Sequence, residues 1–145
     1  MGSKVTSHWS LVFMNNDINK LEIYRKAMRL GEEVWGVVVT WDFFAKDTVG
    51  KQFVRAVDSI AANIAEGYGR HHYKENIHFC QYARGSAEET QTWIEKSANR
   101  ALIEKTTARQ LYRELNTLKK RLNAYIKTIG KPANPKRTTA NTSDQ

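Results

Sequence analysis

Residues 111–129 read Leu-Tyr-Arg-Glu-Leu-Asn-Thr-Leu-Lys-Lys-Arg-Leu-Asn-Ala-Tyr-Ile-Lys-Thr-Ile, and this stretch decides the fold class. Its apolar side chains recur at alternating spacings of four and three, which places them on one side of an α-helix as a continuous seam. We therefore expect an α-helix over residues 104–129 whose opposite side faces solvent. The seam consists of Leu111, Leu115, Leu118, Leu122, Tyr125 and Ile129.

The same periodicity predicts three further helices, over residues 18–41, 48–66 and 73–100. We expect a loop at residues 42–47 that tucks its two phenylalanines inward, and we expect Gly67 to end the second helix in the left-handed conformation. Four long helices with short connections predict an all-α, antiparallel up-down-up-down four-helix bundle of residues 18–130. Residues 1–17 would form an N-terminal arm and residues 131–145 a disordered basic tail.

The first predicted helix is apolar over nearly half of its circumference, more than one core-facing stripe requires. Met28, Trp35 and Val38 widen the apolar stripe that contains Leu30 and Val34. Either a wide intramolecular core or a second surface for a partner accounts for this width. The short apolar segment 9–13 of the arm is likewise either an extended arm or a docking element for a neighbouring subunit.

The chain carries a formal net charge of +8, from 23 Lys and Arg against 15 Asp and Glu among 145 residues. Residues 100–130 hold eight basic and two acidic side chains, so most of the excess lies in the last predicted helix. At 100° per residue, Arg109, Arg113, Lys120 and Lys127 fall opposite the leucine seam, and we call these four the basic stripe. A solvated face or a polyanion-binding surface has this pattern. The residues predicted to bind nucleic acid are the basic stripe, Lys105 and Arg70.

Polar residues on the second and third helices suggest a structural cluster. The short turn between these helices should pack them against each other, and an unpaired buried polar group costs about 1–3 kcal/mol. We therefore expect a buried polar network that fixes the helix register, in preference to a catalytic site. Its predicted members are Arg55, Asn63, Glu66, Ser86 and Glu89.

The sequence offers little that supports catalysis or cofactor binding. A single cysteine, Cys80, excludes an intrachain disulfide and a cysteine-based zinc cage, and its position predicts a core residue. The histidines His71, His72 and His78 lie near a turn without the convergent arrangement that a metal needs. No phosphate-binding loop or nucleophile elbow occurs in the chain. We expect no catalytic residue, metal, cofactor or membrane span, and a cytoplasmic location.

Two motifs about a dozen residues apart resemble a known family. They are Ser59-Ile-Ala-Ala-Asn-Ile-Ala-Glu-Gly-Tyr-Gly-Arg70 and Ala83-Arg-Gly-Ser-Ala-Glu-Glu89. Together they resemble the four-helix-bundle 23S rRNA-intervening-sequence proteins. Residues 24–30 resemble the family's first-helix motif, and residues 52–57 resemble the approach to its second-helix motif. The chain departs from the pattern at Ala62, where the family usually has proline, and in the first loop. The family's motif positions are matched by Arg55, Asn63, Glu66, Gly67, Arg70, Gly85, Ser86 and Glu89.

The resemblance implies a bacterial protein that forms a ring-like homo-oligomer, a homopentamer, through the surplus apolar surface of the first helix. It also implies a more distant relation to the accessory proteins of diversity-generating retroelements, which bind nucleic acid. Our leading hypothesis is a non-enzymatic basic bundle that binds RNA or DNA through phosphate contacts. The alternatives are a protein-interaction scaffold, such as a partner of a reverse transcriptase, and an enzyme that acts on RNA through Arg70 and the nearby histidines.

Overall fold

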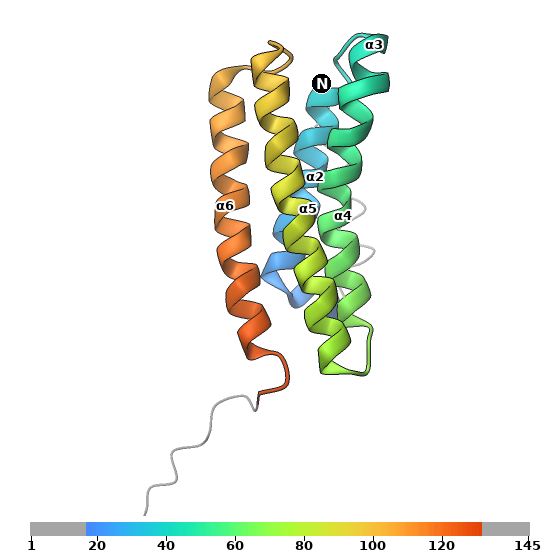
Figure 1. Cartoon of the computed structure of the whole chain (residues 1–145), viewed down its shortest axis with the longest axis vertical. Coiled ribbons are helices and arrows are strands. Elements are labelled where there is room, and N and C mark those ends of the chain that lie inside the picture. Colours follow the sequence, from blue (N-terminus) through green and yellow to red (C-terminus); the bar gives the residue numbers. More distant parts are fainter. Residues whose placement is uncertain (1–16, 132–145) are drawn as a thin grey trace, which may run out of the picture.

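The computed structural model describes residues 17–131, and within that range the chain is helical without a β-strand (Figure 1). Four long helices lie side by side along the length of the molecule, as the sequence predicts, with ends shifted by no more than four residues. Most of the predicted arm and tail lies outside the described residues. The long helices are α2 (Glu22–Val38), α4 (Lys51–Tyr68), α5 (Tyr73–Asn99) and α6 (Lys105–Thr128), and the 3-10 helix η1 (Asp17–Lys20) precedes α2.

The segment between α2 and α4 differs from the predicted loop. It forms a short helix α3 (Phe43–Ala45) that continues through a π-helical turn η2 (Lys46–Gly50) into α4. Asp42 caps α3, because its Oδ1 accepts a hydrogen bond from the Ala45 backbone N–H at 2.9 Å. Phe43 and Phe44 are 80% and 77% exposed, so the prediction that they tuck inward was wrong.

Four of the six residues of the predicted leucine seam are buried, whereas Tyr125 and Ile129 are half-buried. Leu111, Leu115, Leu118 and Leu122 are at most 2% exposed. The seam packs with the apolar sides of the other long helices into one core, in which Phe53 of α4 is fully buried. Fully burying one leucine side chain contributes about 1.5–3 kcal/mol, so these four residues strongly favour the observed rotation of α6. That rotation directs the opposite side of α6 toward solvent.

Helices α4 and α5 approach each other closely at Gly67, which lies inside α4. A Cβ atom built at Gly67 would lie 2.9 Å from the Phe79 Cβ and 2.7 Å from the Asn76 Oδ1, both on α5. The prediction that Gly67 ends the helix in a left-handed conformation was wrong, since Gly130 is the glycine with positive φ in residues 17–131. Gly67 instead makes room for the neighbouring helix.

The side of α5 that faces the core is formed largely by small residues, and Cys80 is a core residue as predicted. Cys80, Ala83 and Ala87 are fully buried there. Burial raises the pKa of the Cys80 thiol to about 11, so the thiol is un-ionised near neutral pH. None of the helices described in residues 17–131 is long and apolar enough to cross a membrane.

Candidate nucleic-acid interface

The basic stripe lies on the exposed side of α6. Arg109, Arg113, Lys120 and Lys127 are all exposed, because the leucine seam occupies the opposite side of the same helix. The first and last members are separated by 18 residues of helix, which corresponds to about 27 Å at 1.5 Å per residue. The four cations therefore form an ordered line along one helix.

The cations of the basic stripe carry no ion pair with any carboxylate in residues 17–131. Two other cations of the same helix do: the Lys119 ammonium lies 2.7 Å from the Glu88 carboxylate, and the Arg121 guanidinium pairs with Glu22. The structure thus separates the basic residues of α6 into a group that stabilises helix packing and a group whose charge is uncompensated locally. The second group is available to an external polyanion.

Lys105 and Arg70 occupy different environments. Lys105 is the first residue of α6 and is exposed, so it extends the basic stripe by one turn toward the helix start. Arg70 belongs to the turn between α4 and α5, where its Nη2 lies 2.5 Å from the Glu66 Oε1. Its guanidinium also stacks over the Phe79 ring at 5.1 Å from the ring centre. Arg70 is therefore engaged within the chain, whereas Lys105 has no ion pair among residues 17–131.

The residues of the predicted polar network do not meet in one buried cluster. Asn63 donates to the Ser59 backbone oxygen at 2.8 Å, and the Ser86 backbone oxygen accepts from the Thr90 hydroxyl, so each bond stays within its own helix. Glu66 pairs with Arg70 and Glu89 accepts from Trp93, again within four residues along the chain. Asn63, Glu66 and Glu89 find partners within four residues and so need none across the helix contact, and Asn63 and Ser86 are half-buried. Exposed members are Arg55, Glu66 and Glu89.

A buried polar network does exist, but it joins α5 to α6. The Gln91 side chain is 3% exposed, and its Nε2 donates to the Tyr112 backbone oxygen at 3.2 Å and to the Asn116 Oδ1 at 2.9 Å. Its Oε1 accepts a hydrogen bond from the Lys119 Nζ at 2.7 Å. The sequence holds one signal of this network. Gln91 lies on the same side of α5 as Ala87 and Ile94, so it is a polar residue at a position where the helical period predicts an apolar one.

This network and a second contact fix how α5 and α6 lie beside each other. Arg84 donates to the Asn123 Oδ1 at 2.6 Å, one turn or more from the contacts of Glu88 and Gln91. Partners on α6 have lower numbers as residue numbers on α5 rise, so the two helices run antiparallel. These contacts therefore fix the position of α6, and of the basic stripe on it, relative to α5.

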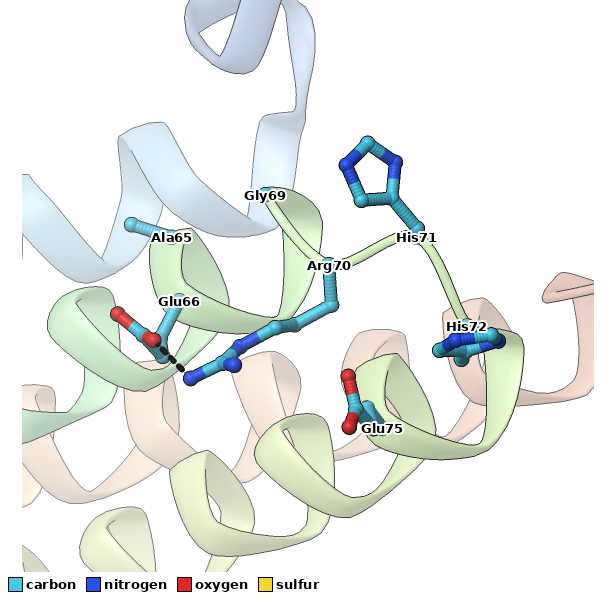
Figure 2. Close-up of a pocket in the computed structure, with 7 residues that line it drawn as sticks. All are labelled: Ala65, Glu66, Gly69, Arg70, His71, His72 and Glu75. Atoms are coloured by element: carbon cyan, nitrogen blue, oxygen red, sulfur yellow. Dashed lines mark hydrogen bonds and ion pairs between the residues drawn. The ribbon is translucent and has the colours of Figure 1, made fainter.

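The turn between α4 and α5 surrounds an open hollow of about 450 Å³ (Figure 2). Arg70 reaches across it toward Glu66, while the His71 ring points away from the other labelled side chains. In residues 17–131 no group of three or more His, Cys, Asp or Glu side chains is arranged to hold a metal ion. The hollow is lined by Ala65, Glu66, Gly69, Arg70, His71, His72 and Glu75.

Two carboxyl groups face each other where α2 meets α6. Burial raises the pKa of Glu33, and the facing Glu114 carboxyl raises it further, whereas Arg29 and Lys26 lower it. The raised pKa favours the protonated Glu33 carboxyl, which can form a hydrogen bond with Glu114.

A second pair of carboxyl groups lies between α2 and α4. Burial raises the pKa of Asp58, and the nearby Glu32 carboxylate adds to that rise. Asp58 lies against α2 at Gly31, where a Cβ atom would come within 2.8 Å of the Asp58 Oδ1. A hollow of about 330 Å³ lies beside this contact. It is lined by Tyr24, Ala27, Met28, Glu32, Asp58, Ala61, Ala62 and Ala65.

A family model described as 23S rRNA-intervening sequence protein matches residues 19–124, which include α2, α4, α5 and most of α6. The chain belongs to this family. A solved structure from Bacteroides thetaiotaomicron, described as a protein with unknown function from the S23 ribosomal protein family, has the same fold with a TM-score of 0.66. It is 22% identical, and the match covers 73% of this chain and 99% of that one. No curated protein matches the chain significantly.

Proposed function

We propose that this family member is a non-enzymatic, cytoplasmic protein that binds nucleic acid through phosphate contacts on the outer side of α6. The observation that carries the proposal is the basic stripe, four exposed cations in line without an ion pair in residues 17–131. Lys105 extends the same surface, and Arg70 stands apart because Glu66 already compensates its charge. The family's printed name, which refers to 23S rRNA, makes RNA the first probe to use.

The geometry of the basic stripe suits a regular polyanion. A line of about 27 Å spans roughly eight base pairs of duplex at 3.4 Å per step, so several phosphates can be met at once. Four phosphate contacts would give a salt slope of about −2.8 for a single strand and about −3.6 for a duplex. The affinity of one copy would therefore be modest at physiological salt and largely independent of sequence.

Self-association would raise this affinity. We propose that the up-down-up-down bundle assembles as a ring-like homo-oligomer, a homopentamer, through the apolar surface of α2 and α3. Trp35, Phe43 and Phe44 are 56%, 80% and 77% exposed on these two helices, and Met28 is 45% exposed. Large apolar side chains exposed as a contiguous patch are typical of protein interfaces. A ring would repeat the basic stripe around its circumference, and several weak contacts would then act together.

The experiment compares two charge-reversed variants that change the net charge equally. Arg113→Glu with Lys120→Glu alters the basic stripe, whereas Lys46→Glu with Arg55→Glu alters exposed cations of η2 and α4. Binding of a fluorescent structured RNA and of a duplex DNA is measured by anisotropy over a series of salt concentrations. Circular dichroism and analytical ultracentrifugation establish that fold and oligomeric state are unchanged.

We expect the stripe variant to lose at least about tenfold in affinity at low salt, with a salt slope reduced by about 1.4–1.8. The control variant should lose much less. Equal losses in the two variants would refute the stripe as the site, because they would reflect net charge alone. If the wild-type protein binds nucleic acid only when a protein partner is also present, the scaffold role is favoured instead.

A further inference from the structure

An exposed aromatic ring lies at the end of the basic stripe. Tyr73 is the first residue of α5 and is 65% exposed. The start of α5 and the end of α6 lie at the same end of the bundle (Figure 1). There the Tyr73 ring packs on Gly130, where a Cβ atom would come within 3.0 Å of the ring Cδ2. The glycine, with φ of +80°, allows the ring to lie close to the backbone that follows α6.

Three lysines lie close in the sequence to Tyr73 or to Gly130. Lys127, the last member of the basic stripe, precedes Gly130 by three residues, and Lys131 follows it directly. Lys74 is the next residue after Tyr73, and all three lysines are exposed. None of the three has an ion pair in residues 17–131. A flat aromatic surface between free cations is the arrangement by which proteins stack a nucleobase while holding its phosphates.

We propose that Tyr73 stacks an unpaired base at the end of the basic stripe, so that the interface prefers single-stranded nucleic acid over continuous duplex. The inference rests on the proposed function, because the basic stripe supplies the phosphate contacts. In a duplex the base faces are covered by their neighbours, and the Tyr73 ring gains no stacking partner there. A single strand offers one exposed base face to the ring while its backbone follows α6.

Tyr82 is another exposed aromatic residue of α5, and it lacks these features. Tyr82 is 56% exposed, but it lies nine residues from Tyr73 and so about half a turn away around α5. Its ring meets Phe79 edge to face at 5.7 Å between ring centres, on the α4 side. Tyr82 therefore provides a matched control, an equally large exposed ring on the same helix away from the basic stripe.

The test uses two single-stranded oligonucleotides of about 12 units with the same number of phosphates. One is oligouridine, and the other is an abasic chain that lacks every base. Anisotropy measures the affinity of the full-length protein and of Tyr73→Ala, Tyr73→Phe and Tyr82→Ala for both. We expect the wild-type protein, Tyr73→Phe and Tyr82→Ala to prefer oligouridine by roughly 5- to 100-fold. Tyr73→Ala should bind both chains about equally.

Two outcomes separate this inference from the proposed function. Equal affinity of the wild-type protein for the two chains, lowered in parallel by Arg113→Glu with Lys120→Glu, would overturn stacking and leave phosphate binding standing. Absence of binding to either chain at low salt would overturn both. Loss of the preference in Tyr82→Ala, or its survival in Tyr73→Ala, would also refute Tyr73 as the stacking residue.

Discussion

Two glycines inside long helices should respond in opposite ways to the same substitution. Replacing a helical glycine with alanine stabilises a helix by about 0.5–1 kcal/mol when the methyl group has room. At Gly85 of α5 nothing lies within 4 Å of the added Cβ. We therefore expect Gly85→Ala to raise the free energy of unfolding by about 0.5–1 kcal/mol.

At Gly67 the same methyl group meets α5. The Asn76 amide can turn aside, but the Phe79 Cβ at 2.9 Å is anchored directly to the backbone of α5. Forcing an extra carbon into a packed contact costs about 1–3 kcal/mol, which exceeds the gain in helix propensity. Gly67→Ala should therefore lower the free energy of unfolding by about 1–2 kcal/mol, a difference of about 1.5–3 kcal/mol from Gly85→Ala.

Urea unfolding followed by circular dichroism measures both variants at one protein concentration. A roughly tenfold dilution shows whether self-association contributes, because association stabilises the folded chain by mass action. If Gly67→Ala stabilises the protein as much as Gly85→Ala does, the close approach of α4 and α5 at this residue is wrong.

Two further predictions concern polar contacts of α6. The raised pKa of Glu33 means that its stabilising contribution is complete below the pKa of an unfolded Glu and is lost as pH rises through the folded pKa. Glu114→Gln should therefore be more stable than the wild-type protein at pH 7 and should lose that advantage near pH 4, as measured by thermal unfolding. A stability difference between the two proteins that does not change with pH would contradict the pairing of Glu33 with Glu114. Gln91→Leu should cost about 1–3 kcal/mol, because it removes three side-chain hydrogen bonds, one of them to the charged Lys119 ammonium. A double-mutant cycle with Lys119→Met should give a coupling of about 0.5–3 kcal/mol, and zero coupling would refute the contact between their side chains.

The sequence predicted the helices well because each long helix has an apolar side with the helical period. The seam of α6 from Leu111 to Leu122 is buried, and the basic stripe on its other side is exposed. One periodic pattern determines both facts, since a helix that buries one side must expose the opposite one. The candidate site was therefore located by the same residues that predicted the fold.

Tertiary contacts were predicted less well, because they depend on which helix sides meet. Asn63 and Ser86 form bonds within their own helices, while Gln91 and Lys119 form the contact between helices. Periodicity places a residue on a side but does not say how closely two helices approach. Periodicity also does not show that Asp42 caps a short helix where a loop was predicted, or that Phe43 is exposed there.

The π-helical turn η2 has a consequence for how the family can vary in length. In this turn the Lys51 backbone N–H bonds to the Lys46 carbonyl oxygen, five residues back, so the turn holds one residue more than an α-helical turn. A relative that lacks one residue between 46 and 50 would close an ordinary α-helical turn and keep every later residue of α4 on the same side. The turn is thus a point where an insertion or deletion leaves Phe53, Gly67 and everything packed on them in place.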